Sequence, residues 1–150
     1  MNDRIMQDAL KRIDRLERAL AQLTVPDAAQ YAMGSFTWDT STGTQAITGV
    51  GFTPRLVLFF STGFAASATV LTHGFGTDDG TNRRSTSERV SAASQYRSKS
   101  ATYSMRLLES DSTTAGVEGY VQSMDSGGFT INRVTHTGSP QPEWYYVAIG

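Results

Sequence analysis

The sequence contains no cysteine, and its charges almost cancel. Without cysteine the chain has no disulfide framework, no thiol nucleophile and no thiolate metal site, so its stability must come from packing or from oligomerisation. The formal net charge of -1 and the isoelectric point near 6.1 provide no overall attraction to nucleic acid or to an anionic membrane. We therefore expect no nucleic-acid partner.

Long apolar runs are also missing. The first residues lack the apolar core of a signal peptide, and no segment approaches the roughly 20 apolar residues that span a bilayer. We expect synthesis in the cytoplasm and no membrane insertion. The 150 residues leave room for one ordinary domain and a short appendage, but not for two full domains.

The residue constellations of catalysis are absent as well. His73 and His136 each lack a second histidine at metal-ligand spacing, and the sequence contains no nucleophile elbow, phosphate-binding loop or zinc-protease helix. Asp78 and Asp79 could offer oxygens to Ca²⁺, but an Asp-Gly turn explains them better because the twelve-residue ligand loop is incomplete. The sequence thus predicts no enzyme, no catalytic or metal residues and no cofactor.

Charge is concentrated at the start of the chain, where 9 of the 27 charged side chains lie between Asp3 and Arg18. Apolar residues in the same segment recur at alternating spacings of three and four, which is the seam pattern of a coiled coil. A helix is expected from about Asp3 to Leu23, ended by Pro26. The predicted oligomerisation seam consists of Met6, Ala9, Ile13, Leu16, Leu20 and Leu23.

Two features of the segment favour a parallel trimer. Arg12 and Glu17 fall at positions where opposite charges pair between parallel neighbours, and Ile5 and Leu10 widen the seam slightly. The alternatives are a dimer, or a single amphipathic helix folded onto its own domain. Three heptads form too small a seam to hold a trimer alone, so either the β-domain trimerises too or the helix docks elsewhere.

Beyond the linker the composition changes to one rich in Ser, Thr and Gly, which suits strands and turns. We expect a mainly β chain: an antiparallel β-sandwich or jelly roll at 34–150, preceded by a coiled-coil helix at 1–25 and a linker at 26–33. The expected strands lie near Gly34 to Thr40, Thr44 to Thr48, Arg55 to Ser61, Ala68 to Phe75, Ala101 to Glu109, Gly116 to Met124, Gly128 to Val134 and Trp144 to Ile149.

Two of these runs are apolar without alternation. Leu56 to Phe60 should be covered on both faces, which predicts a central strand or one that faces a neighbouring subunit. Trp144 to Ile149 reads as a last strand that closes the sheet. Between the runs, Thr81 to Ser100 carries few large apolar residues and is expected to be a long connection. Its candidate contact residues are Arg83, Arg84, Arg89, Tyr96 and Arg97.

The stretch GTQAITGVGFTPRLVLFF at 43–60, together with WYYVAIG at 144–150, resembles a β-domain of phage tail and head fibre proteins. In that group a G-F-x-P turn leads into a buried strand, and a Y-x-A-I-G strand lies at the carboxyl end. The resemblance implies a virion component, often trimeric, that is assembled in the host cytoplasm, and it implies no catalytic residues. Gly51 and Pro54 also suit such a turn on physical grounds, because glycine permits unusual backbone angles and proline lacks the N–H of a ladder.

The sequence leaves two functions open. The first is a structural role, in which the helix trimerises the chain and docks it to other virion proteins of the capsid or tail. The second is a receptor-binding module for a host surface glycan or protein, with Tyr96, Tyr103 and Tyr120 as possible stacking platforms. A polysaccharide depolymerase is disfavoured because the required acid pair is not evident.

Overall fold

The computed structural model describes residues 7, 11–13, 15, 30–38, 41–63, 70–108, 115–136 and 141–150. Of the predicted seam, only Ile13 belongs to these residues; it is helical and half exposed. Met6, Ala9, Leu16, Leu20 and Leu23 lie outside the described residues, and the coiled coil stays a prediction. Within the described ranges, no helix has the length and hydropathy needed to cross a membrane.

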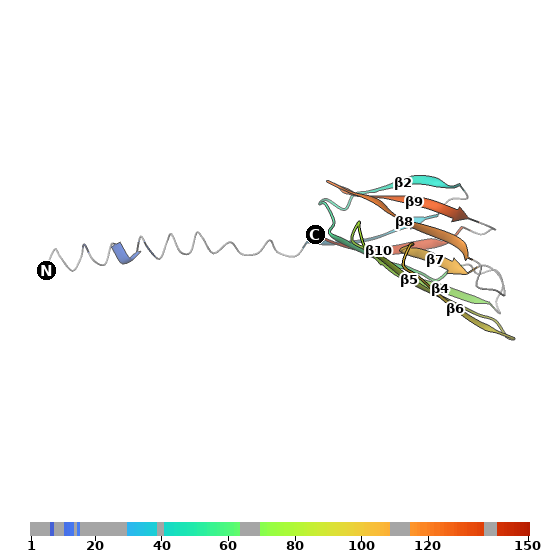
Figure 1. Cartoon of the computed structure of the whole chain (residues 1–150). Helices are drawn as coiled ribbons and strands as arrows, with labels where there is room; N and C mark the ends of the chain where they lie inside the picture. Colours follow the sequence, from blue (N-terminus) through green and yellow to red (C-terminus); the bar gives the residue numbers. More distant parts are fainter. Residues whose placement is uncertain are drawn as a thin grey trace.

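The described residues from Tyr31 onward form an all-antiparallel β structure (Figure 1). Its strands are β1 (Tyr31–Thr37), β2 (Gly43–Thr48), β3 (Leu56–Ser61), β4 (Leu71–Asp78), β5 (Arg83–Val90), β6 (Gln95–Ser100), β7 (Met105–Leu108), β8 (Ala115–Asp125), β9 (Gly128–His136) and β10 (Glu143–Ile149).

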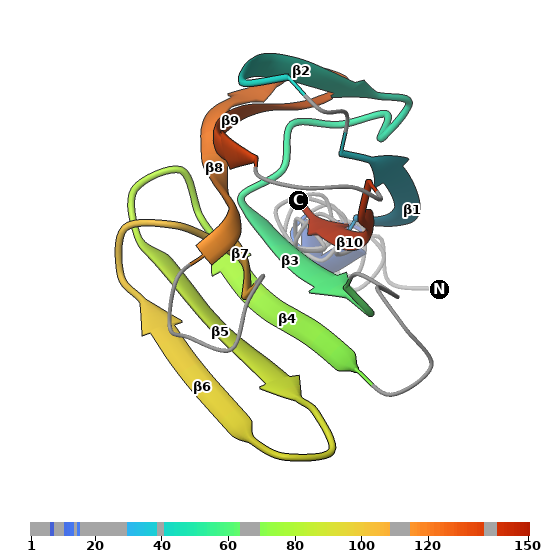
Figure 2. The same cartoon turned by 90° about the vertical axis from the view of Figure 1, so that its right-hand side faces the viewer.

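The strands form two sheets (Figure 2). The first, called sheet A here, has the order β1-β10-β3-β4-β5-β6, and the second, sheet B, has the order β2-β9-β8-β7. The expected mainly β, antiparallel character is confirmed. Because side chains alternate between the faces of a strand, each sheet contributes one face to a shared interior.

Aromatic rings from both sheets fill that interior. Phe59 of β3 meets Phe129 of β9 edge to face, with ring centroids 5.8 Å apart. Trp38, just after β1, lies 6.4 Å from Trp144 of β10. Val57, Met105, Leu107, Val117, Val121 and Ile131 complete the buried core with these rings. Phe36 and Trp38 both point into this interior and are buried.

The expected long connection from Thr81 to Ser100 is wrong. These residues form the hairpin of β5 and β6, which extends sheet A through a regular antiparallel ladder. Its buried positions hold Ser85, Ser87 and Arg89 instead of apolar side chains. A strand held by backbone hydrogen bonds against β4 needs little apolar burial of its own, and the hydrophobic pattern therefore did not reveal it.

The two apolar runs are neighbours in sheet A. β10 lies between β1 and β3, so it is an inner strand and not the closing strand that the sequence suggested. β3 lies between β10 and β4, as a central strand should. Only one face of β3 is buried within the chain: Val57 and Phe59 point into the core, whereas Phe60 is 40% exposed. β1 begins at Tyr31, three residues before its expected start.

Candidate contact surfaces

The two stretches that carry the fibre resemblance meet in space. Residues 49–55 connect β2 to β3, and within them Gly51 has a φ of +86°, a backbone angle that glycine adopts without strain. Arg55 N donates a hydrogen bond of 2.7 Å to the carbonyl of Ile149, and Gly150 N donates one of 2.9 Å to the carbonyl of Gln30. A Cβ on Gly150 would lie 2.7 Å from the Phe52 ring, so the ring packs directly on the backbone there.

We call this set of contacts the junction: Gln30, residues 49–55, Ile149 and Gly150. Val50 N also donates a hydrogen bond of 3.0 Å to the carbonyl of Gly127 in the turn between β8 and β9. The junction therefore ties the end of sheet A to sheet B. It also fixes Gln30, the residue directly before β1, through which the chain arrives from the predicted helix.

The outward face of sheet A is apolar over β1, β10, β3 and part of β4. Alternation places nine side chains on it, which we call the apolar face: Tyr31, Met33, Leu56, Leu58, Phe60, Phe75, Tyr145, Val147 and Ile149. Strand register makes them contiguous, because Tyr145 pairs with Phe60 and Phe60 pairs with Phe75. Tyr31 and Met33 are 73% and 72% exposed.

A groove of about 370 Å³ runs across this face between β1, β10 and β3. Met33, Phe60, Tyr145 and Val147 are among the residues that line it. The Tyr145 hydroxyl donates a hydrogen bond of 2.9 Å to Glu143 Oε2, and this contact raises the pKa of the Tyr145 phenol. With its polar tip paired inside the chain, Tyr145 presents its ring to the surface.

The outward face of the remaining strands is polar, and we call this region the polar half. Glu88 of β5 lies between His73 of β4, at 3.3 Å, and Arg97 of β6, at 2.9 Å. The hydrogen bond from Arg97 is the main reason why the pKa of Glu88 lies below its usual value, with Gln95 adding a second hydrogen bond. These charges lie on β4, β5 and β6, whereas Glu143 of β10 is a carboxylate beside the apolar face.

The five predicted contact residues do not form one surface. Arg84 and Arg97 are exposed on the polar half, and Tyr96 is half-buried. Arg89 points inward and is buried. Arg83 also points inward and joins a network between the sheets. A contact role for Arg84 and Arg97 stays a prediction, whereas Arg83 and Arg89 are placed as interior residues.

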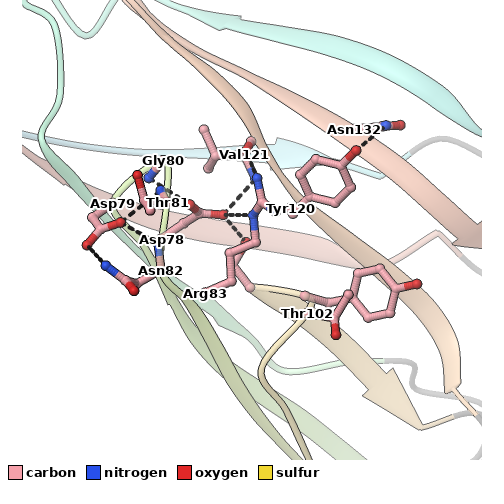
Figure 3. Close-up of polar contacts among 12 residues, drawn as sticks. Asp78, Asp79, Gly80, Thr81, Asn82, Arg83, Thr102, Tyr120, Val121 and Asn132 are labelled. Atoms are coloured by element: carbon pink, nitrogen blue, oxygen red, sulfur yellow. Dashed lines mark hydrogen bonds and ion pairs between the residues drawn. The ribbon is translucent and has the colours of Figure 1, made fainter.

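Asp78 is the centre of that network (Figure 3). Its buried carboxylate accepts hydrogen bonds of 2.8 Å from both Ser104 Oγ and Val121 N, and one of 2.9 Å from Gly80 N. Arg83 Nε lies 3.5 Å from Asp78 Oδ2, which is an ion-pair distance and not a hydrogen bond. The Arg83 guanidinium covers the Tyr120 ring at 4.1 Å, as a cation–π contact requires.

Asp79 forms the turn between β4 and β5. Its Oδ1 accepts hydrogen bonds from the backbone N–H groups of Thr81, at 2.9 Å, and Asn82, at 2.6 Å. The Asn82 side chain donates a further hydrogen bond, and together these bonds lower the pKa of Asp79 to about 2. This geometry is that of an Asp-Gly turn, in agreement with the interpretation preferred from the sequence. Among the described residues, no three acidic or histidine side chains gather where they could hold a metal ion.

A second groove, of about 390 Å³, lies at the β5–β6 end of sheet A. Arg84 and Lys99 line it beside Ser85, Ser100 and Ala101. Both cations stand on the outward face of the polar half. Hydroxyls and two positive charges suit a ligand that carries a carboxylate or phosphate.

Compared with models of protein families, with curated proteins and with solved structures, the chain has no match. The function is therefore argued from the chain's own residues. The apolar face is the feature that the sequence predicted least completely. Its signal was present, because both apolar runs lack the alternation of a strand with one solvated face.

Proposed function

We propose that this chain is a non-enzymatic structural protein of a tailed phage or phage-like particle: a fibre, spike or adaptor that acts as a homotrimer. In this proposal the N-terminal helix forms a parallel coiled coil that docks to other virion proteins, and the β-domain projects from it. The chain is assembled in the host cytoplasm and resides in the virion. We also propose that the two sheets form a jelly-roll-like sandwich, since β1, β2 and β3 alternate between them.

The junction is the observation that carries this proposal. Both stretches of the fibre resemblance meet there, at the residue through which the predicted helix joins the domain. The G-F-x-P turn packs on Gly150, and the N–H of Gly150 donates a hydrogen bond to Gln30 of the entering chain, which suits a domain suspended from a stalk. The resemblance and the geometry therefore support the same mode of attachment.

Particle incorporation tests the proposal directly. Purified particles should contain the chain, detected by mass spectrometry and by immunogold labelling at one location. The double variant Leu16→Asp, Leu20→Asp places charge in the seam and should be lost from particles, because buried unpaired charge is strongly unfavourable. Exposed Arg15→Asp is the matched control. Particles that lack the wild-type chain would contradict the proposal, as would full incorporation of the double variant.

The second candidate function, receptor binding, is favoured by the groove of Arg84 and Lys99. An acidic host glycan is the ligand class that this groove suits. A glycan array probed with the full chain should show binding that Arg84→Ser and Lys99→Ser remove. Binding to no acidic glycan, or binding that survives both substitutions, would argue against this candidate.

A further inference from the structure

We infer that the apolar face of sheet A is the surface through which β-domains of neighbouring copies contact one another. The inference rests on the proposed function in one respect, namely that parallel helices bring the copies together. It adds a second interface, formed by strands, to the helical seam. The occupant of the apolar face is accordingly a second copy of this chain.

The exposed area of the face is the first argument. Tyr31, Met33, Phe60, Phe75 and Tyr145 are between 40% and 73% exposed. With about 200 Å² for each such side chain, their exposed parts amount to roughly 500 Å². The largest apolar patch of a typical soluble monomer covers about 300–600 Å² and is often functional, and this face has that size. Two copies that bury it together remove about 1,000 Å² from water, which is the minimum for a biological interface and below the roughly 1,200–2,000 Å² of stable ones, so the helical seam has to act with it.

The fold does not need these side chains. The core lies on the opposite face of sheet A, where Val57, Phe59, Trp144 and Tyr146 meet sheet B. Phe60 and Phe75 instead pack on each other at the surface, with ring centroids 5.2 Å apart. Large rings that are exposed yet unnecessary for the core are accounted for by contacts with another molecule.

Charge distribution supports an interface limited to this half of the sheet. The nine side chains of the apolar face carry no formal charge, and the carboxylate beside them, Glu143 of β10, accepts a hydrogen bond from Tyr145. The cations and carboxylates on the outward side of β4, β5 and β6, such as Glu88, Arg97 and Lys99, stand in the polar half. An apolar centre beside a charged margin is the usual organisation of a protein interface.

Connectivity identifies the occupant. Tyr31 follows Gln30 directly, and Tyr31 pairs with Ile149 at the junction end of the apolar face. In a parallel trimer the three copies of Gln30 leave the helices close to the common axis, so the adjoining face of each domain lies near its neighbours. A seam of three heptads is too short to hold three chains by itself, and this face supplies the contacts that it lacks.

Matched surface substitutions in the full chain test the inference. Phe60→Asp adds a charge to the apolar face at a 40% exposed site, and Val134→Asp adds one on sheet B at a 39% exposed site. By sedimentation velocity over a concentration series, Phe60→Asp should weaken trimer formation at least tenfold, whereas Val134→Asp should leave it unchanged. Far-UV circular dichroism and thermal unfolding show whether each variant is folded.

Crosslinking provides a measurement that does not depend on the stability of Phe60→Asp. Since the chain has no cysteine, Met33→Cys places one thiol on the apolar face and Gln95→Cys places one on the exposed edge strand β6. Under mild oxidation at micromolar concentration, Met33→Cys should give disulfide-linked dimers, and Gln95→Cys should remain unlinked.

The outcomes separate this inference from the proposed function. A trimer that Phe60→Asp leaves intact, without Met33→Cys crosslinks, overturns the inference but leaves the helical trimer in place. The Phe60→Asp variant could also keep the mass of a trimer but fail to enter particles. That result would assign the apolar face to a different virion protein, and it too would overturn the inference. A monomeric wild-type chain overturns the inference and the proposed trimer together.

Discussion

Asp78 in sheet A accepts a hydrogen bond of 2.8 Å from the backbone N–H of Val121 in sheet B. The carboxylate is buried and also contacts Ser104 and Arg83. Without Asp78, the Val121 N–H and the Ser104 hydroxyl would each lose their buried acceptor, which is costly. The contact therefore fixes how the polar end of sheet A is held against sheet B.

Replacing Asp78 by alanine should lower the free energy of unfolding by about 2–6 kcal/mol, because the Val121 N–H and the Ser104 hydroxyl each lose a buried acceptor. Urea unfolding followed by circular dichroism measures the change. Asp125→Ala is the control, since that exposed carboxylate makes one side-chain hydrogen bond, to Thr130. An Asp78→Ala variant as stable as the control would show that the network adds little to stability.

Asp79 should make stability depend on pH in the acid range. Its pKa in the folded chain is about 2, below the ordinary value of 3.8, because Asn82 and Thr81 donate hydrogen bonds to the charged form. A lowered pKa stabilises the folded state above the ordinary value, and this contribution is lost as the pH falls from about 4 to about 2. Nuclear magnetic resonance titration of the Asp79 carboxyl should give a midpoint near 2.

The Asn82→Ala variant should raise the titration midpoint of Asp79, because the Asn82 side chain is the largest cause of the lowered pKa.

The Asp79→Ala variant tests the effect on stability. Its thermal unfolding between pH 4 and pH 2 should lack the part of the acid dependence that comes from Asp79. An Asp79 midpoint near 3.8 in the wild-type chain would mean that the turn hydrogen bonds do not persist in solution.

Gly51 provides a test of the junction. An alanine there must adopt a φ near the +86° that Gly51 has, and this backbone angle costs an L-residue about 1–2 kcal/mol. Gly51→Ala should reduce the free energy of unfolding by that amount. Gly127→Ala is matched to it, since Gly127 has no positive φ and open space around its Cα. Equal stability of the two variants would indicate that residues 49–55 relax without strain.

Several parts of the fold were open to sequence reasoning. The content of Ser, Thr and Gly predicted a mainly β chain, and the unbroken run at Leu56 to Phe60 predicted a central strand, which β3 is. The expected cover on both faces of this strand is not found within one chain, where Phe60 is 40% exposed. The hairpin of β5 and β6 was missed because Ser85, Ser87 and Arg89 occupy its buried positions. When the buried positions of a strand hold polar side chains, the sequence shows no hydrophobic alternation there.

The candidate surfaces were harder to predict than the strands. Arg83 and Arg84 are adjacent in sequence, yet one lies between the sheets and the other on the outward face. A one-residue step reverses the side of a strand, so a surface can be assigned only when the strand itself is known. The apolar face requires even more, because the pairing of Tyr145, Phe60 and Phe75 depends on register between distant segments.

The placement of the apolar face has a consequence for both candidate functions. If this face meets other copies, the groove of Arg84 and Lys99 lies away from the interface, on β5 and β6 at the other edge of the same sheet. A trimer would then present three such grooves to the surroundings. Assembly through the apolar face and recognition through the polar half are compatible, because they use opposite ends of one sheet.

The mass of the full chain in solution at micromolar concentration tests the central claim most directly. Sedimentation velocity with multi-angle light scattering should give close to three times the 16.3 kDa of one chain. Dilution should dissociate this species, because the seam and the apolar face are both small. A folded monomer whose mass stays at 16.3 kDa across the concentration series would contradict the account.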